Sequence, residues 1–269
     1  MSEELEKSNN ISHEDLEALK NAKSTMNNIS WAMRNANKIG STVETGATFI
    51  PEKVFNKLQK IMHSVLLGII KVNLKTIKKN KTFSKPSNKT YRAIVTGSGA
   101  LSGFLGSTTG VGTAIFASEL TLTTKFLMRT IMDIARSEGE DIYSIEGQMA
   151  CLEVFALGGE SKEDDGLETS YYTTRVALSS AIQNVTAQGI NSFVSKIVTR
   201  WSIQVTEKFV AQAVPVLGAV GGGSINYIFI NHFQNMATAH FTIKRLERKY
   251  GKELIEKVFK TININTIDK

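Results

Sequence analysis

The chain has 269 residues, a net charge of +7, three prolines and a single cysteine, Cys151. One cysteine excludes an intrachain disulfide, and the polar, acidic start MSEELEKSNN carries no secretory signal, so a reducing cytoplasm is expected. The hydrophobic content of 42% supports a sizeable core. Long proline-free stretches with helical periodicity predict an all-α fold, since alternating strand-like runs are hard to find.

The N-terminal region is predicted to be polar and to hold one helix. Ser12, followed three residues later by Asp15, resembles a capping box, and the helix is expected to run to about Lys38. The predicted organisation has three parts: a polar region over 1–50, a single helical domain over 51–260 and a tail over 261–269.

A basic amphipathic helix is predicted from Glu52 to about Lys79. Its apolar stripe consists of Val54, Leu58, Ile61, Val65, Ile69, Val72 and Ile77. The helix either packs on the core as a surface helix or lies at a membrane interface with its lysines toward headgroups.

No acidic residue occurs between Glu52 and Glu119, while eleven basic residues do. Such a block can pair internally with the acid-rich stretch 133–168, or it can face anionic phospholipid headgroups. Nucleic acid is a poorer partner because Phe83 and Tyr91 are the only aromatics among the later lysines and no nucleic-acid motif accompanies them. The candidate headgroup-binding residues are Lys71, Lys75, Lys78, Lys79, Lys81, Lys85, Lys89 and Arg92.

Two uncharged, glycine-rich stretches stand out, one in 93–118 and one in 209–243. A phosphate-binding loop is not supported, because no lysine lies between Lys89 and Lys125 and Ser102 occupies the position of the third glycine of GxGxxG. Glycines four apart let two helix axes approach closely, which predicts two glycine-rich, closely packed helical hairpins in a multi-helix bundle. The candidate helix-packing glycines are Gly99, Gly103, Gly106, Gly110, Gly218 and Gly222.

The remaining helices are predicted from capping residues at their starts and glycines at their ends. A helix through Arg136 should bury Leu120, Leu127, Ile131 and Ile134 and should end at Gly139, and Ser144 should cap the next helix, which reaches Leu157. Further helices are expected over 171–188 and 191–213. A long helix should end at Tyr250-Gly251, with only a short tail of mixed charge after it. Gly139 and Gly251 also align across two similar segments, which suggests an internal structural repeat.

Several polar residues fall in these apolar segments. Glu119 either caps a helix or joins a buried polar centre, for which Arg129, His232, His240 and Arg245 are candidate partners. The predicted polar core is Glu119, Arg129, Asn226, His240 and Arg245. Tyr171, Tyr172 and Arg175 are expected to anchor the acidic loop before them, and Cys151 is expected in the core.

Enzyme chemistry has weak support. The catalytic candidates are Glu119 with His232 or His240 as general base and acid. The two histidines are too far apart along one helix to share a metal directly, and neither HExxH nor GxSxG occurs. No metal and no cofactor is therefore predicted.

Four segments carry a family resemblance: ELTLTTKFLMRTIMDIARSEGEDIYS (119–144), ACLEVFALGG (150–159), YYTTR (171–175) and QAVPVLGAVGGGSINYIFINHFQNMATAHFTIKRLERKYG (212–251). They resemble the EcsC family over roughly Lys89 to Gly251. Thr121 departs from the family, in which proline is frequent at this point. The resemblance implies a bacterial, helical, glycine-rich, membrane-associated protein of no established activity, accessory to an ABC transporter.

Three hypotheses follow. The first is a non-enzymatic, membrane-associated protein that binds anionic membrane or lipid through the basic helix and the glycine-rich hairpins, peripheral to the inner membrane or shallowly inserted in it. The second is a soluble carrier or adaptor with an apolar pocket, which docks a membrane protein such as a transporter subunit. The third is a hydrolase using Glu119 with a histidine.

Overall fold

The structure is a computed structural model that describes residues 11–41, 52–77, 86–106, 112–158, 167–180, 187–213 and 218–262. Nine helices and no strand make up this part of the chain: α2 (His13–Ser41), α4 (Glu52–Leu74), α5 (Asn88–Gly106), α6 (Gly112–Ser137), α7 (Ile145–Leu157), α8 (Leu167–Ser179), α9 (Ala187–Ala213), α10 (Gly218–Tyr250) and α11 (Lys252–Thr261). The predicted all-α bundle is confirmed.

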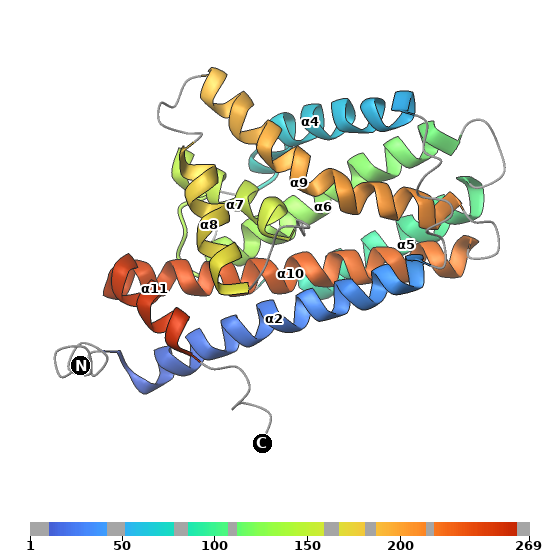
Figure 1. The fold of residues 1–269 in the computed structure, drawn as a ribbon. Helices are drawn as coiled ribbons and strands as arrows, with labels where there is room; N and C mark the ends of the chain where they lie inside the picture. Colours follow the sequence, from blue (N-terminus) through green and yellow to red (C-terminus); the bar gives the residue numbers. More distant parts are fainter. Residues whose placement is uncertain are drawn as a thin grey trace.

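Helix α10 is the element around which the others pack. It contacts α2, α5, α6, α7, α9 and α11, and Figure 1 shows it running through the bundle with α2 beside it. The chain carries no formal charge between Lys208 and Lys244, so most of α10 can be enclosed without burying an ion. Ile230, Phe233 and Phe241 are accordingly almost or fully inaccessible to solvent.

Helix α6 has the predicted buried face. Leu120, Leu127, Ile131 and Ile134 are all buried, as their helical spacing indicates. Helix α6 contacts α4, α5, α7 and α10. It therefore connects the basic helix α4 to the glycine-rich helix α5.

The predicted apolar stripe of α4 is confirmed in part, since Leu58, Ile69 and Ile77 are buried, but the helix ends at Leu74 rather than near Lys79. Val72 is 44% exposed, whereas Asn73 is buried. The Asn73 amide donates to the Ile69 carbonyl at 3.1 Å and to the Lys125 carbonyl of α6 at 3.2 Å, which turns this position inward. The buried face consists of Leu58, Met62, Leu66, Ile69, Ile70 and Asn73. Val54 has a side chain outside the described residues.

The predicted caps and stops are present at several helix ends. The Ser144 hydroxyl accepts from the Gly147 amide at 2.9 Å at the start of α7. Gly139 and Gly251 have φ angles of 78° and 92°, a left-handed region in which glycine carries no Cβ penalty. The prediction of a tail directly after Gly251 is wrong, because α11 follows and buries Ile255 and Phe259. The spacing of Leu254, Ile255, Val258 and Phe259 is that of an amphipathic helix, so this signal was present in the sequence and was missed.

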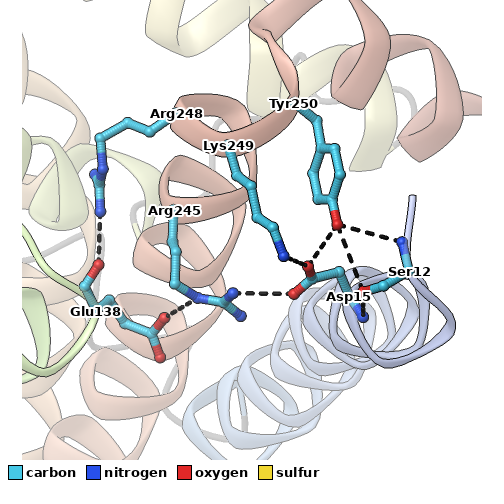
Figure 2. Close-up of polar contacts among 7 residues, drawn as sticks. All are labelled: Ser12, Asp15, Glu138, Arg245, Arg248, Lys249 and Tyr250. Atoms are coloured by element: carbon cyan, nitrogen blue, oxygen red, sulfur yellow. Dashed lines mark hydrogen bonds and ion pairs between the residues drawn. The ribbon is translucent and has the colours of Figure 1, made fainter. Parts of the chain in front are cut away.

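The N-terminal helix α2 is held against α10 by a charged cluster (Figure 2). The Asp15 carboxylate accepts from Arg245 at 3.0 Å, from Lys249 at 2.6 Å and from the Tyr250 hydroxyl at 2.8 Å. These donors hold the pKa of Asp15 well below its usual range. The Ser12 hydroxyl caps α2 as predicted, by accepting from the Asp15 amide at 3.2 Å, while the Asp15 carboxylate turns to α10.

Candidate functional site

The buried carboxylate of Glu119 lies where α5, α6 and α10 meet. It accepts from the Thr123 hydroxyl at 2.5 Å and from the Asn226 amide at 2.8 Å. The same Asn226 amide donates to the Val95 carbonyl of α5 at 2.7 Å. One side chain of α10 thus bridges α5 and α6, and the structure brings together two members of the predicted polar core, Glu119 and Asn226.

Arg129 lies in a separate cluster nearer the surface. Its guanidinium donates to Thr76 at 2.8 Å and to the Tyr91 hydroxyl at 3.3 Å, and it lies 3.7 Å from the Asp133 carboxylate. These contacts connect the end of α4 and the start of α5 through α6. Arg245 lies in the α2 cluster instead, where it also donates to Glu138 at 2.8 Å.

The two histidines of α10 occupy different buried environments. His232 Nε2 lies 2.8 Å from the Gly158 carbonyl oxygen, and burial lowers the pKa of His232 to about 4. His240 Nδ1 lies 3.0 Å from the Tyr171 hydroxyl, and burial lowers the pKa of His240 well below its usual value. The structure therefore gives each histidine a partner other than Glu119. Within the described ranges, no three histidine, cysteine or acidic side chains gather as a metal site would require.

A buried ionic cluster around His240 was not predicted from the sequence. Arg175 of α8 donates to both carboxylate oxygens of Glu247, at 2.7 and 2.8 Å, and its guanidinium lies over the Tyr171 and Tyr172 rings. Glu153 of α7 lies 3.7 Å from His240, and burial raises the pKa of Glu153. Tyr171, Tyr172 and Arg175 thus face α10 and α11. Residues 160–166 of the acidic loop that they were expected to anchor lie outside the described residues, and residues 167–169 belong to α8.

The lysines of the basic stretch form an exposed ridge. Lys53, Lys57 and Lys60 are exposed at helical positions i, i+4 and i+7 of α4, and Lys75 and Lys89 are also exposed. None of these five makes an ion pair with any described carboxylate. Of the other predicted headgroup-binding residues, Lys71 has an undescribed side chain, and Lys78, Lys79, Lys81 and Lys85 lie outside the described residues.

Arg92 is half-buried rather than freely exposed. It donates to the Gln234 amide oxygen at 2.8 Å, and its guanidinium lies 5.5 Å from the centre of the Tyr227 ring. The guanidinium thus links α5 to α10 while it covers an aromatic ring that is 45% exposed.

Large apolar side chains are exposed on several helices, most of them on α4, α5 and α10. Two each occur on α4, α5 and α10 and one on α6, while α7 and α8 carry one each. Those of the first four helices are Leu67, Val72, Ile94, Leu101, Leu122, Tyr227 and Ile228.

The two glycine-bearing helices α5 and α10 pack directly on each other. They run antiparallel, since Arg92 reaches Gln234 while Ala100 faces Gly223. A Cβ at Gly223 would lie 3.4 Å from the Ala100 Cβ, so the contact is close without excluding a methyl group. Gly99 is buried in α5. Gly110 lies outside the described residues, as do the surroundings of Gly103, Gly106, Gly218 and Gly222.

None of the described helices combines the length and the apolar character that crossing a bilayer requires. A search of curated proteins and a search of solved structures each returned no match. The family model of the EcsC protein family matches residues 13–246. This match begins well before Lys89, so it includes α2 and the basic helix α4, which the resemblance in the sequence did not cover. The chain belongs to the EcsC protein family.

Proposed function

We propose that this protein binds the surface of anionic membranes as a peripheral protein, through the basic ridge of α4 and the glycine-rich helices α5 and α10. The observation that carries the proposal is the set of exposed lysines on α4 without described carboxylate partners. Clustered lysines at a membrane surface gain about 1 kcal/mol each from anionic headgroups.

The acid-rich stretch supports this interpretation because three of its described carboxylates are paired with arginines elsewhere in the structure. Glu138 pairs with Arg245, Glu140 pairs with Arg248, and Asp133 lies beside Arg129. These pairs leave the positive charge of α4 uncompensated by the structure. An uncompensated surface of one sign attracts a partner of the opposite sign.

The ridge also has a suitable shape. Lys53, Lys57 and Lys60 lie along two turns of α4, over about 10 Å at a rise of 1.5 Å per residue, and the helix packs on α6 and α9. A straight row of lysines can contact a flat layer of phosphates at several points together. Docking beside a transporter subunit on the cytoplasmic face of the inner membrane would agree with the family resemblance.

Vesicle flotation tests the proposal directly. The protein should float with vesicles containing phosphatidylglycerol and stay in solution with pure phosphatidylcholine, and salt well above 0.15 M should release it because ions screen the attraction. Lys53→Gln/Lys57→Gln/Lys60→Gln should weaken binding by roughly two orders of magnitude, at about 1 kcal/mol per lysine.

A charge-matched control separates the ridge from overall charge. Lys20→Gln/Lys252→Gln/Lys260→Gln removes the same charge from α2 and α11 and should leave binding nearly unchanged. Equal losses of vesicle binding in both triple variants would show that binding depends on the overall charge of the protein and not on the ridge. No anionic-lipid dependence in the unmodified protein would remove the proposal.

A further inference from the structure

Helix α5 has an unusual distribution of side chains for a helix in water. Its outward stripe is Thr90, Ala93, Ile94, Gly97 and Leu101, which recur at helical spacing. Ile94 is 39% exposed and Leu101 is 62% exposed, whereas Val95 is the one large apolar side chain that α5 fully buries within its described part. Two of the three large aliphatic side chains in the described part of α5 are therefore exposed.

The inward side of α5 is held by polar contacts and by small residues. The Tyr91 hydroxyl donates to Asp133 at 2.7 Å, Arg92 donates to Gln234, and the Val95 carbonyl accepts from Asn226. At Gly223 of α10, the nearest atoms of α5 belong to the small residues Ala100 and Thr96.

This arrangement matches helix packing in lipid rather than in water. Where the surroundings are apolar, helices associate through small residues and interhelical hydrogen bonds, and large apolar side chains face outward. We infer that the outward stripe of α5, with Ile94 and Leu101, inserts among the acyl chains of the membrane. This inference rests on the proposed function and identifies the outward stripe of α5 as the part of the protein that enters the membrane.

The ends of the stripe fit a shallow position in the interface. Lys89 is exposed at the start of α5, and Arg92 with the half-exposed Tyr227 ring lies one turn further on. Cations and tyrosines of this kind settle at headgroup level while aliphatic groups lie deeper. These groups would hold the N-terminal end of α5 at headgroup level, with Ile94 and Leu101 among the acyl chains.

A second copy of the chain is a weaker occupant for this stripe. The sequence from Lys53 to Ser118 has no acidic residue, so two such surfaces would bring like charges together. An anionic bilayer supplies both the opposite charge and an apolar layer.

Site-specific fluorescence measures the insertion. Gly97→Cys introduces a thiol where a Cβ meets no neighbour, and Val176→Cys places a control on the exposed face of α8. Cys151 is fully buried, and burial raises the pKa of its thiol, so the introduced cysteine reacts selectively. With an environment-sensitive nitrobenzoxadiazole label and phosphatidylglycerol vesicles, the label at position 97 should brighten about threefold and be quenched by lipids brominated on their acyl chains. The label at position 176 should do neither.

Leu101→Ser gives a second readout on a side chain that the fold leaves exposed. It should weaken vesicle binding about tenfold, because one inserted leucine is lost, while Val176→Ser changes nothing. Flotation with anionic vesicles while the label at position 97 stays in water and Leu101→Ser binds normally would overturn the insertion and leave the proposed function intact. Absence of flotation would overturn both. Lipid-independent, concentration-dependent shielding of the label would instead identify a second copy on this stripe.

Discussion

The amide of Asn226 lies 2.8 Å from the carboxylate of Glu119, at the point where α10 meets α6. Both residues are buried, and the same amide nitrogen also donates to the Val95 carbonyl of α5. This side chain therefore satisfies acceptors on both helices of the α5–α6 hairpin. A buried acceptor that loses its donor retains its full desolvation cost, so the position should be sensitive to substitution.

Asn226→Ala should destabilise the protein by roughly 2–4 kcal/mol, because it leaves two buried acceptors, on Glu119 and Val95, without this donor. Urea denaturation followed by circular dichroism measures the change. Glu119→Gln on the Asn226→Ala background should cost less than it does alone, because the two side chains interact. Additive effects of the two substitutions would contradict the coupling.

Two glycines should respond in opposite ways to alanine. A Cβ at Gly147 would overlap the Asp141 carbonyl oxygen of the backbone, which cannot move without distorting the start of α7. Gly147→Ala should therefore destabilise by about 2 kcal/mol or more. Gly223 has room for a methyl group, so Gly223→Ala should be neutral or should stabilise by up to about 1 kcal/mol through helix propensity. Denaturation midpoints in the reverse order would contradict this assignment.

The helices and many of their ends could be predicted because they depend on local patterns. The buried face of α6 follows from the spacing of Leu120, Leu127 and Ile131, and the start of α7 follows from Ser144. The buried face of α4 could be obtained only in part this way. Its apolar residues extend around most of the helix, and the contact between Asn73 and α6 decides which of them turn inward.

The contacts of the buried polar residues were even harder to predict from the sequence. Arg129, His232, His240 and Arg245 were candidate partners of Glu119, yet each has a different partner in the structure. Which side chains meet depends on the rotation of each helix and on its neighbour. Asn226 was selected with Glu119, but the cluster of Arg175 and Glu247 gave no sequence signal, since the two residues are 72 positions apart and lie on separate helices.

Buried His232 should make stability depend on pH. Its pKa is about 4 in the folded protein and 6.5 when it is free of the fold, so the unfolded state binds the proton more readily. The contribution of neutral His232 to the free energy of unfolding is complete above pH 6.5 and is lost as the pH falls toward 4. The total loss is about 3 kcal/mol, at 1.36 kcal/mol per pKa unit.

His232→Gln tests this contribution while its amide can still donate to the Gly158 carbonyl. Urea denaturation at pH 7, 6, 5 and 4.5 should show a smaller loss of stability in the variant than in the unmodified protein. His13→Gln, at an exposed position of α2, serves as the control and should follow the unmodified curve. Parallel curves for His232→Gln and the unmodified protein would contradict the assignment.

The ion pair between Arg175 and Glu247 should contribute much more than an exposed pair. Its carboxylate is bound at both oxygens, at 2.7 and 2.8 Å, and both side chains are about 10% exposed or less. Arg175→Gln leaves Glu247 buried without its cation and should cost about 3–5 kcal/mol of stability. Arg175→Lys should also destabilise the protein, because lysine cannot form the bidentate contact. Lys20→Gln, in the exposed pair with Glu17, should cost less than about 1 kcal/mol. Thermal and urea unfolding of the three variants would compare these values, and a similar cost at Arg175 and Lys20 would show that solvent reaches the cluster between α8 and α10.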